Sequence, residues 1–89
     1  MELERDVEAY LTREVTRRNG LCIKHGQDGW PDRIIVLPNG RTVWCETKKH
    51  DGKMSELQKL RAKELRDRGH TVYPAWGRDD VDRMLEEVT

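Results

Sequence analysis

Residues 32–48 have the sequence DRIIVLPNGRTVWCETK, which predicts two β-strands joined by a tight turn. The segments 32–37 and 41–48 are rich in β-branched and aromatic residues, which favour strands. Between them, Pro38-Asn39-Gly40 is typical of a hairpin turn. We therefore expect an antiparallel hairpin, and the rest of the fold is built outward from it.

The second strand of this hairpin carries a carboxylate and an ammonium group on one face. Successive side chains of a strand point to opposite sides, so Trp44, Glu46 and Lys48 share a face. Asp32 stands at the start of the partner strand, directly after Pro31. Two acids and a lysine can therefore converge where the two strands meet the end of the sheet.

The flanking sequence alternates between helical and strand-like patterns. Apolar residues recur at helical spacing in residues 2–18 before Asn19-Gly20, and Ser55 to Gln58 has the form of a capping box that opens a second helix. The further elements expected are a strand at 21–24, the end of the second helix at Gly69, a strand at 70–75 and a helix at 78–88. The order αβββαβα predicts an α/β fold that occupies residues 1–89 as a single domain.

Composition restricts the function classes. Charged residues make up 38% of the chain and hydrophobic residues 35%, and the formal net charge is zero, which argues against a polycation that coats nucleic acid. Cys22 and Cys45 are isolated and lie in strand-like segments, so we expect reduced thiols in the core. No apolar run approaches the length of a membrane span, and we expect a cytoplasmic protein of a bacterial or phage-infected cell.

Asp32, Glu46 and Lys48 suit the hydrolysis of a phosphodiester. Carboxylate oxygens select a hard cation such as Mg²⁺ or Mn²⁺, which takes one or two acids from a protein. Lys48 would hold the attacking water or help to deprotonate it, and would stabilise charge at phosphorus. A Glu-x-Lys pair on an exposed strand is common by itself, so its position after a hydrophobic strand and before a capped basic helix carries the interpretation.

The chain resembles the PD-(D/E)XK nuclease superfamily, and within it the stand-alone phage and bacterial VRR-NUC (virus-type replication-repair nuclease) domains. The matching segments follow the family order, and they are Gly29-Trp30-Pro31-Asp32-Arg33-Ile34, Val43 to Lys48, Ser55 to Gln58, and Gly69 to Val72. The resemblance implies a restriction-endonuclease-like αβββαβ core with a mixed central sheet flanked by helices.

The resemblance also implies an activity and a set of ligands. We expect an Mg²⁺- or Mn²⁺-dependent DNA endonuclease that acts on branched DNA and resolves four-way (Holliday) junctions as a homodimer. A flap- or end-directed nuclease is the alternative activity. An accessory subunit that binds DNA without cutting it is the alternative of another class.

Three further residues take roles from the family pattern. The family uses an acid from its first helix, and we expect Glu4 rather than Glu8, because Glu4 lies on the apolar stripe and would turn inward. Thr47 stands where relatives often have a hydrophobic residue, and its backbone carbonyl is expected to join Asp32, Glu46 and Glu4 as a metal ligand. Gln58 matches a glutamine near the family's active site and also the third helical position of the capping box.

Overall fold

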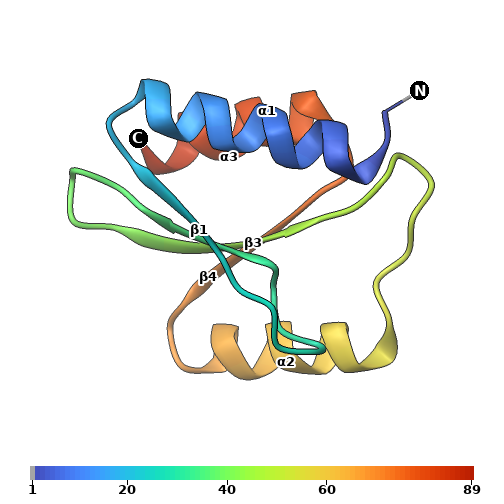
Figure 1. Ribbon diagram of the computed structural model, residues 1–89. Helices are drawn as coiled ribbons and strands as arrows, with labels where there is room; N and C mark the ends of the chain where they lie inside the picture. The colour runs from blue at the N-terminus through green and yellow to red at the C-terminus, as the bar shows by residue number, and fades with distance from the viewer. Residues whose placement is uncertain (1) are drawn as a thin grey trace.

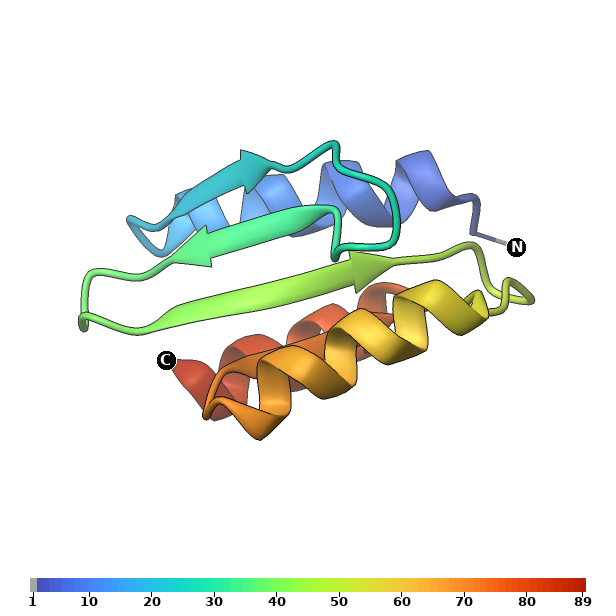
Figure 2. The same ribbon diagram turned by 90° about the horizontal axis from the view of Figure 1, so that it is seen from below.

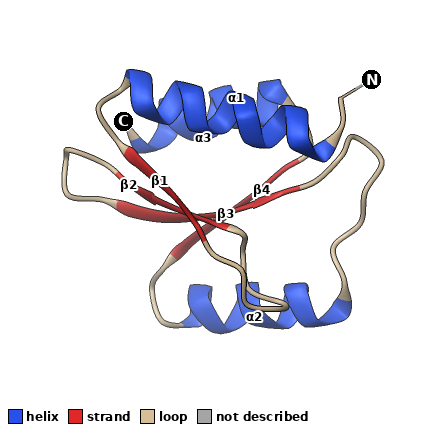
Figure 3. Cartoon of the chain, in the orientation of Figure 1, coloured by secondary structure: helices blue, strands red, loops and turns tan. Residues whose placement is uncertain are grey.

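The structure is a computed structural model that describes residues 2–89 as a three-layer arrangement of helices around one sheet (Figure 1). Two helices cover one face of the sheet and one helix covers the other (Figure 3). The elements in chain order are α1 (Glu4–Arg17), β1 (Leu21–Lys24), β2 (Arg33–Val36), β3 (Thr42–Thr47), α2 (Glu56–Asp67), β4 (Thr71–Ala75) and α3 (Arg78–Val88). The order αβββαβα and the α/β class predicted from the sequence are confirmed.

The sheet has the strand order β1-β2-β3-β4 and is mixed. β1 pairs with β2 and β2 pairs with β3 in antiparallel fashion, so the predicted hairpin is formed, with Arg33 opposite Cys45. β3 and β4 are parallel because α2 carries the chain back along the sheet between them (Figure 2). Asp32 directly precedes β2, so the register of β2 with β3 places it beside the end of β3.

The larger hydrophobic core lies between the sheet and the helices α1 and α3. The apolar stripes of both helices face inward, and the members of this core are therefore fully or nearly fully buried. They include Val7, Leu11, Val15, Ile35, Val43, Cys45, Val81, Met84, Leu85 and Val88. Cys45 is buried and Cys22 is half-buried, and both thiols are free, as the sequence predicts.

The opposite face of the sheet carries a much smaller core beneath α2. Ala62, Leu65 and Val72 are its buried members, and Trp30 and Trp44 pack against it with half-buried rings. The rings of Trp30 and Trp44 lie 6.4 Å apart between centroids, a distance typical of aromatic pairs. α2 is thus attached to the sheet by far less apolar surface than α1 and α3.

The helices and strands agree with the sequence prediction to within about two residues at each end, which is the usual uncertainty of such boundaries. The third helix has the predicted bounds, Arg78–Val88. The predicted capping box is present at the start of α2, where Ser55 Oγ accepts a hydrogen bond from the N–H of Gln58. Within residues 2–89, no helix combines the length and the apolar character required to cross a membrane.

Candidate active site

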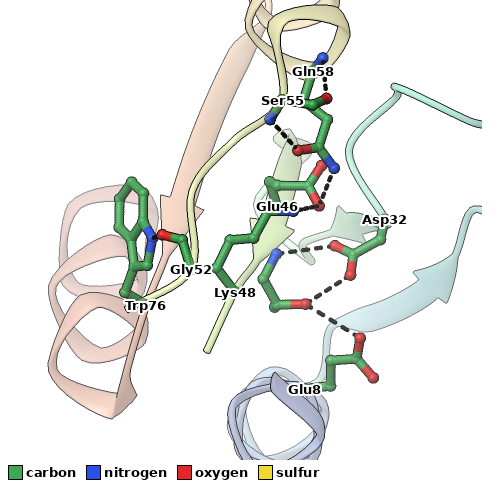
Figure 4. Close-up of polar contacts among 9 residues, drawn as sticks. Glu8, Asp32, Glu46, Lys48, Gly52, Ser55, Gln58 and Trp76 are labelled. Atoms are coloured by element: carbon green, nitrogen blue, oxygen red, sulfur yellow. Dashed lines mark hydrogen bonds and ion pairs between the residues drawn. The ribbon is translucent and has the colours of Figure 1, made fainter. Parts of the chain in front are cut away.

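An open cleft of about 340 Å³ lies where β2 begins and β3 ends, between α1 and α2. Its lining contains every side chain that the sequence singled out for chemistry. These are Asp32, Glu46, Lys48, Glu4 and Gln58, together with Glu8 and the loop that precedes β2. Figure 4 shows how Glu8, Asp32, Glu46 and Gln58 converge from three different elements and from that loop. The structure therefore brings these five predicted residues together at one cleft.

Asp32 is fixed by the last residue of β3. The backbone N–H of Thr47 donates to Asp32 Oδ1 at 3.0 Å, and the Thr47 hydroxyl donates to Oδ2 at 2.6 Å (Figure 4). Each donor engages a different oxygen of the carboxylate. The Asp32 side chain consequently has one orientation, even though it comes from a loop rather than from the strand itself.

The loop that carries Asp32 is shaped by Gly29. This residue has a φ of +82°, a backbone conformation that residues other than glycine adopt rarely. A Cβ placed there would lie 2.5 Å from Leu57 Cγ in α2, closer than any ordinary contact. Glycine is required for both reasons, and the tight approach packs the loop against Leu57 at the start of α2.

Glu46 is the most deeply buried acid of the cleft, with only 3% of its surface exposed. Gln58 Nε2 lies 3.5 Å and Lys48 Nζ lies 4.0 Å from Glu46 Oε1, while Oε2 is buried without a hydrogen-bond partner in the described residues. Burial and the charge of Asp32 raise the pKa of Glu46 to about 7, although Lys48 opposes the shift. A buried acid with one free oxygen and a perturbed pKa is typical of a functional site.

Gln58 serves the helix cap and the cleft at the same time. Its Oε1 accepts a hydrogen bond from the Ser55 N–H at 2.8 Å, which completes the capping box, while its Nε2 points to Glu46 (Figure 4). The two interpretations of Gln58 drawn from the sequence are therefore compatible, because each uses a different end of the amide.

The first helix brings Glu8 rather than Glu4 into contact with the other acids. The Thr47 hydroxyl lies 3.3 Å from Glu8 Oε1, and Asp32 accepts from the same hydroxyl. Glu4 also lines the cleft, but its side chain is exposed, so the expectation that it turns inward is wrong. Glu4 is the first residue of α1 and lies at the rim, whereas Glu8, one turn later, reaches the end of β3.

Arg33 links this acidic group to the core side of the sheet, and the sequence did not single it out for that role. Its side chain is almost fully buried, and it lies 3.2 Å from Glu8 Oε2 and donates to the Asp32 carbonyl at 3.0 Å. Burial and Asp32 raise the pKa of Glu8, and Arg33 opposes this shift. Arg33 and Ile35 are the buried residues of β2 and share one face of the strand, and a buried guanidinium requires an acidic partner.

The donor set fits a small hard cation, although the cluster of three acids expected from the sequence is not formed. Within residues 2–89, no group of three or more Asp, Glu, His or Cys side chains is placed to hold a metal ion. Asp32 and the free oxygen of Glu46 remain, which matches the one or two carboxylates that Mg²⁺ takes from proteins.

The backbone of Thr47 adds a third oxygen on the same side. The N–H and C=O of one strand residue point to the same edge of the strand, and the Thr47 N–H points to Asp32. The carbonyl of Thr47 is therefore directed toward the same edge of β3 as Asp32. Two carboxylates and one carbonyl are oxygen donors, and they fit Mg²⁺ or Mn²⁺ better than a softer metal.

Comparisons with known proteins agree with this fold. No protein-family model matches the sequence. A protein from Acyrthosiphon pisum secondary endosymbiont phage 1, named "Putative nuclease p44", is 33% identical over 72 residues, which cover 78% of this chain and 77% of the phage protein. A solved structure described as "VRR_NUC domain" matches with a TM-score of 0.88 and 27% identity over 97% of each chain. The chain belongs to the VRR-NUC domain family.

Proposed function

We propose that this protein is a metal-dependent endonuclease that hydrolyses DNA phosphodiesters, with Asp32, Glu46 and Lys48 as its catalytic residues. The observation that carries the proposal is the buried Glu46 oxygen without a partner, on a residue that lines the cleft together with Asp32 and Lys48. Evolution rarely retains an uncompensated buried carboxylate for stability, since its desolvation is costly. Membership of the VRR-NUC family supports the same conclusion.

Each side chain has a separable role in this proposal. Asp32, Glu46 and the Thr47 carbonyl would hold Mg²⁺ or Mn²⁺, which when bound neutralises phosphate charge and lowers the pKa of water. Lys48, 4.0 Å from Glu46, is near enough to orient a water and to stabilise negative charge on the phosphate. Gln58 orients Glu46, and Thr47 orients Asp32. Glu4 and Glu8 are the two candidates for the helix acid, and contact with Thr47 favours Glu8.

The test compares cleavage of labelled DNA by wild-type protein and by the variants Glu46→Gln and Lys48→Ala. We expect cleavage with Mg²⁺ or Mn²⁺ and none in chelator, and a loss of at least about 100-fold in each variant. Glu86→Gln is the matched control, because Glu86 is exposed on α3 and does not line the cleft. Full activity of Glu46→Gln would refute the catalytic assignment. Calorimetric titration with Mn²⁺ should show binding that Glu46→Gln removes.

Gln58→Glu separates the two roles of Gln58. Glutamate keeps the oxygen that caps the Ser55 N–H, so the helix start is preserved, but it replaces the donor near Glu46 by a second negative charge. We expect nearly unchanged helicity together with weaker Mn²⁺ binding and slower cleavage. Ser55→Ala should do the reverse, with a less stable α2 and a smaller effect on cleavage. Equal effects of both variants on cleavage would mean that Gln58 acts only through the cap.

For the biological substrate, we propose four-way DNA junctions cut by a homodimer. A pair related by a two-fold axis presents two active sites to the two equivalent strands of a junction. The free edge of β1 supports self-association, because Leu21 is 61% exposed and Ile23 is 46% exposed on this outermost strand. Their cross-strand partners are Val36 and Ile34, so the apolar surface continues onto β2. Such an edge is a ready template for pairing with a second copy.

Light scattering and a substrate panel test these two finer points. The dimer predicts about twice the monomer mass for wild-type protein and a monomer for Ile23→Lys, which places a charge on the edge strand. Paired symmetric nicks on junctions alone would support the resolvase. Preferential cutting of flaps or ends would favour the alternative nuclease, and DNA binding without cleavage would favour an accessory subunit.

A further inference from the structure

The cleft continues into a groove that runs along the segment between β3 and α2. A neighbouring hollow of about 330 Å³ shares Glu4 and Lys48 with the cleft and adds Lys49. A third hollow of about 430 Å³ shares Gly52 and Lys53 with the second. The other residues that line this third hollow are Met54, Glu56, Lys59 and Trp76. The three hollows therefore follow one another along a path that leads away from Asp32 and Glu46, and each shares two lining residues with the next.

The path is lined with lysines. Lys48, Lys49, Lys53 and Lys59 line its second and third hollows, against the two acids Glu4 and Glu56. The ion pairs that engage these lysines beyond the cleft are exposed: Lys49 lies 3.6 Å from Asp51, and Lys59 lies 3.3 Å from Glu56. Such pairs contribute little and exchange readily for a phosphate. Among the residues that the structure describes, no ion pair engages Lys53 within 4.0 Å.

The segment that presents Lys49 and Lys53 is held in shape by hydrogen bonds to two adjacent residues at the end of β4, Ala75 and Trp76. The Lys48 N–H donates to the Ala75 carbonyl at 2.9 Å, which extends the pairing of β3 with β4. The Trp76 indole N–H donates to the Gly52 carbonyl at 2.6 Å, as Figure 4 shows. A preformed loop binds a ligand without the cost of ordering it first. The lysines are therefore carried on a fixed support rather than on a free tail.

We infer that this groove binds the DNA strand on one side of the cut, with Lys49 and Lys53 each contacting a backbone phosphate. The inference rests on the proposed nuclease function, because the groove begins at the residues assigned to catalysis. Lysine acts as a point charge toward phosphate and reads no sequence. The groove consequently provides affinity and fixes the direction in which the strand leaves the cleft, while the base sequence is immaterial to it.

The experiment measures binding of a DNA duplex without divalent metal, so that it is independent of cleavage. The slope of log K against log salt is negative for DNA binding. We expect the double variant Lys49→Ala/Lys53→Ala to make this slope less steep by about 1.8, at about 0.9 for each phosphate contact. Between 50 and 200 mM salt, its loss of affinity should therefore be about tenfold smaller than that of wild type. The matched control is Lys63→Ala/Arg83→Ala, which removes two exposed charges that line none of the three hollows.

A second measurement tests the direction of the strand. Duplexes are shortened on one side or the other of the cut, and we expect the effect of the double variant to vanish with one shortened flank only. The inference is overturned if the double variant has the same salt slope as wild type, or if the control variant changes the slope equally. It is also overturned if the effect of the double variant is the same whichever flank is shortened. Cleavage by wild type alongside any of these results leaves the proposed function intact, whereas a wild type that neither binds nor cuts DNA overturns both.

Discussion

The burial of Glu46 predicts that the protein is more stable without the negative charge of this residue. The perturbation is Glu46→Gln, which keeps the size of the side chain and removes its charge. Glu46 is 3% exposed and faces Asp32, and burial and this neighbour raise its pKa from 4.5 to about 7. Folding therefore favours the protonated form, and ionisation at higher pH reduces stability.

The size of the effect follows from the pKa in the folded and unfolded states. Stability from protonated Glu46 is fully present below the unfolded pKa of 4.5 and is lost as pH rises through about 7. The difference between the unfolded and folded pKa values corresponds to about 3 kcal/mol of unfolding free energy at pH 8, and local relaxation around Glu46 reduces this amount. We expect Glu46→Gln to match wild type near pH 4 and to exceed it by about 2 to 3 kcal/mol at pH 8.

Urea denaturation between pH 4 and pH 8 in the presence of chelator measures this difference. Adding Mn²⁺ at pH 8 should narrow it, because a cation bound to Glu46 stabilises only the wild type. Glu86→Gln is the control, since its side chain is exposed on α3 and should show no such pH dependence. A difference between Glu46→Gln and wild type that stays constant with pH, or a variant less stable at pH 8, would refute the reasoning.

Three other changes have directions fixed by single contacts. Gly29→Ala should cost about 1 to 3 kcal/mol by thermal denaturation, and adding Leu57→Ala should recover part of it if the steric contact matters as much as the backbone angle. Thr47→Val should cost about 1 to 2 kcal/mol and slow cleavage, because Asp32 loses its hydroxyl donor, whereas Thr47→Ser should retain most activity in the same assays. Glu8→Gln should reduce cleavage more than Glu4→Gln, and the opposite ranking in parallel assays would return the helix acid to Glu4.

Local sequence patterns determine most of this fold, and so they could be interpreted from one chain. The turn at Pro38 to Gly40, the capping box at Ser55 and the apolar stripe of 78–88 each depend on residues close together in the sequence. The period-two alternation also placed Glu46 on the face of Trp44 and hence toward α2. Where the signal is local, prediction and structure agree.

The contact between the first helix and Thr47 could not be predicted because it depends on where α1 lies along the sheet. Glu4 and Glu8 are one turn apart and both line the cleft, and helical periodicity alone cannot say which turn lies beside Thr47. The same holds for Arg33, whose partner Glu8 lies 25 positions earlier in the sequence and is identified only by the packing of α1 on the sheet. Long-range contacts of this kind leave no local pattern.

The hydrophobic cores on the two faces of the sheet differ in size, and the residues of the site are attached to both. The two parts of the site should therefore differ in how readily they open locally. Asp32 and Thr47 are anchored where α1 and α3 bury the larger core, whereas Gln58 is carried by α2, which rests on Ala62, Leu65 and Val72. Amide hydrogen exchange should accordingly be faster in α2 than in β3, because fewer apolar contacts oppose its fluctuations. Transient release of α2 would free Glu46 from Gln58 while Asp32 stays in register, so the cleft can widen without global unfolding.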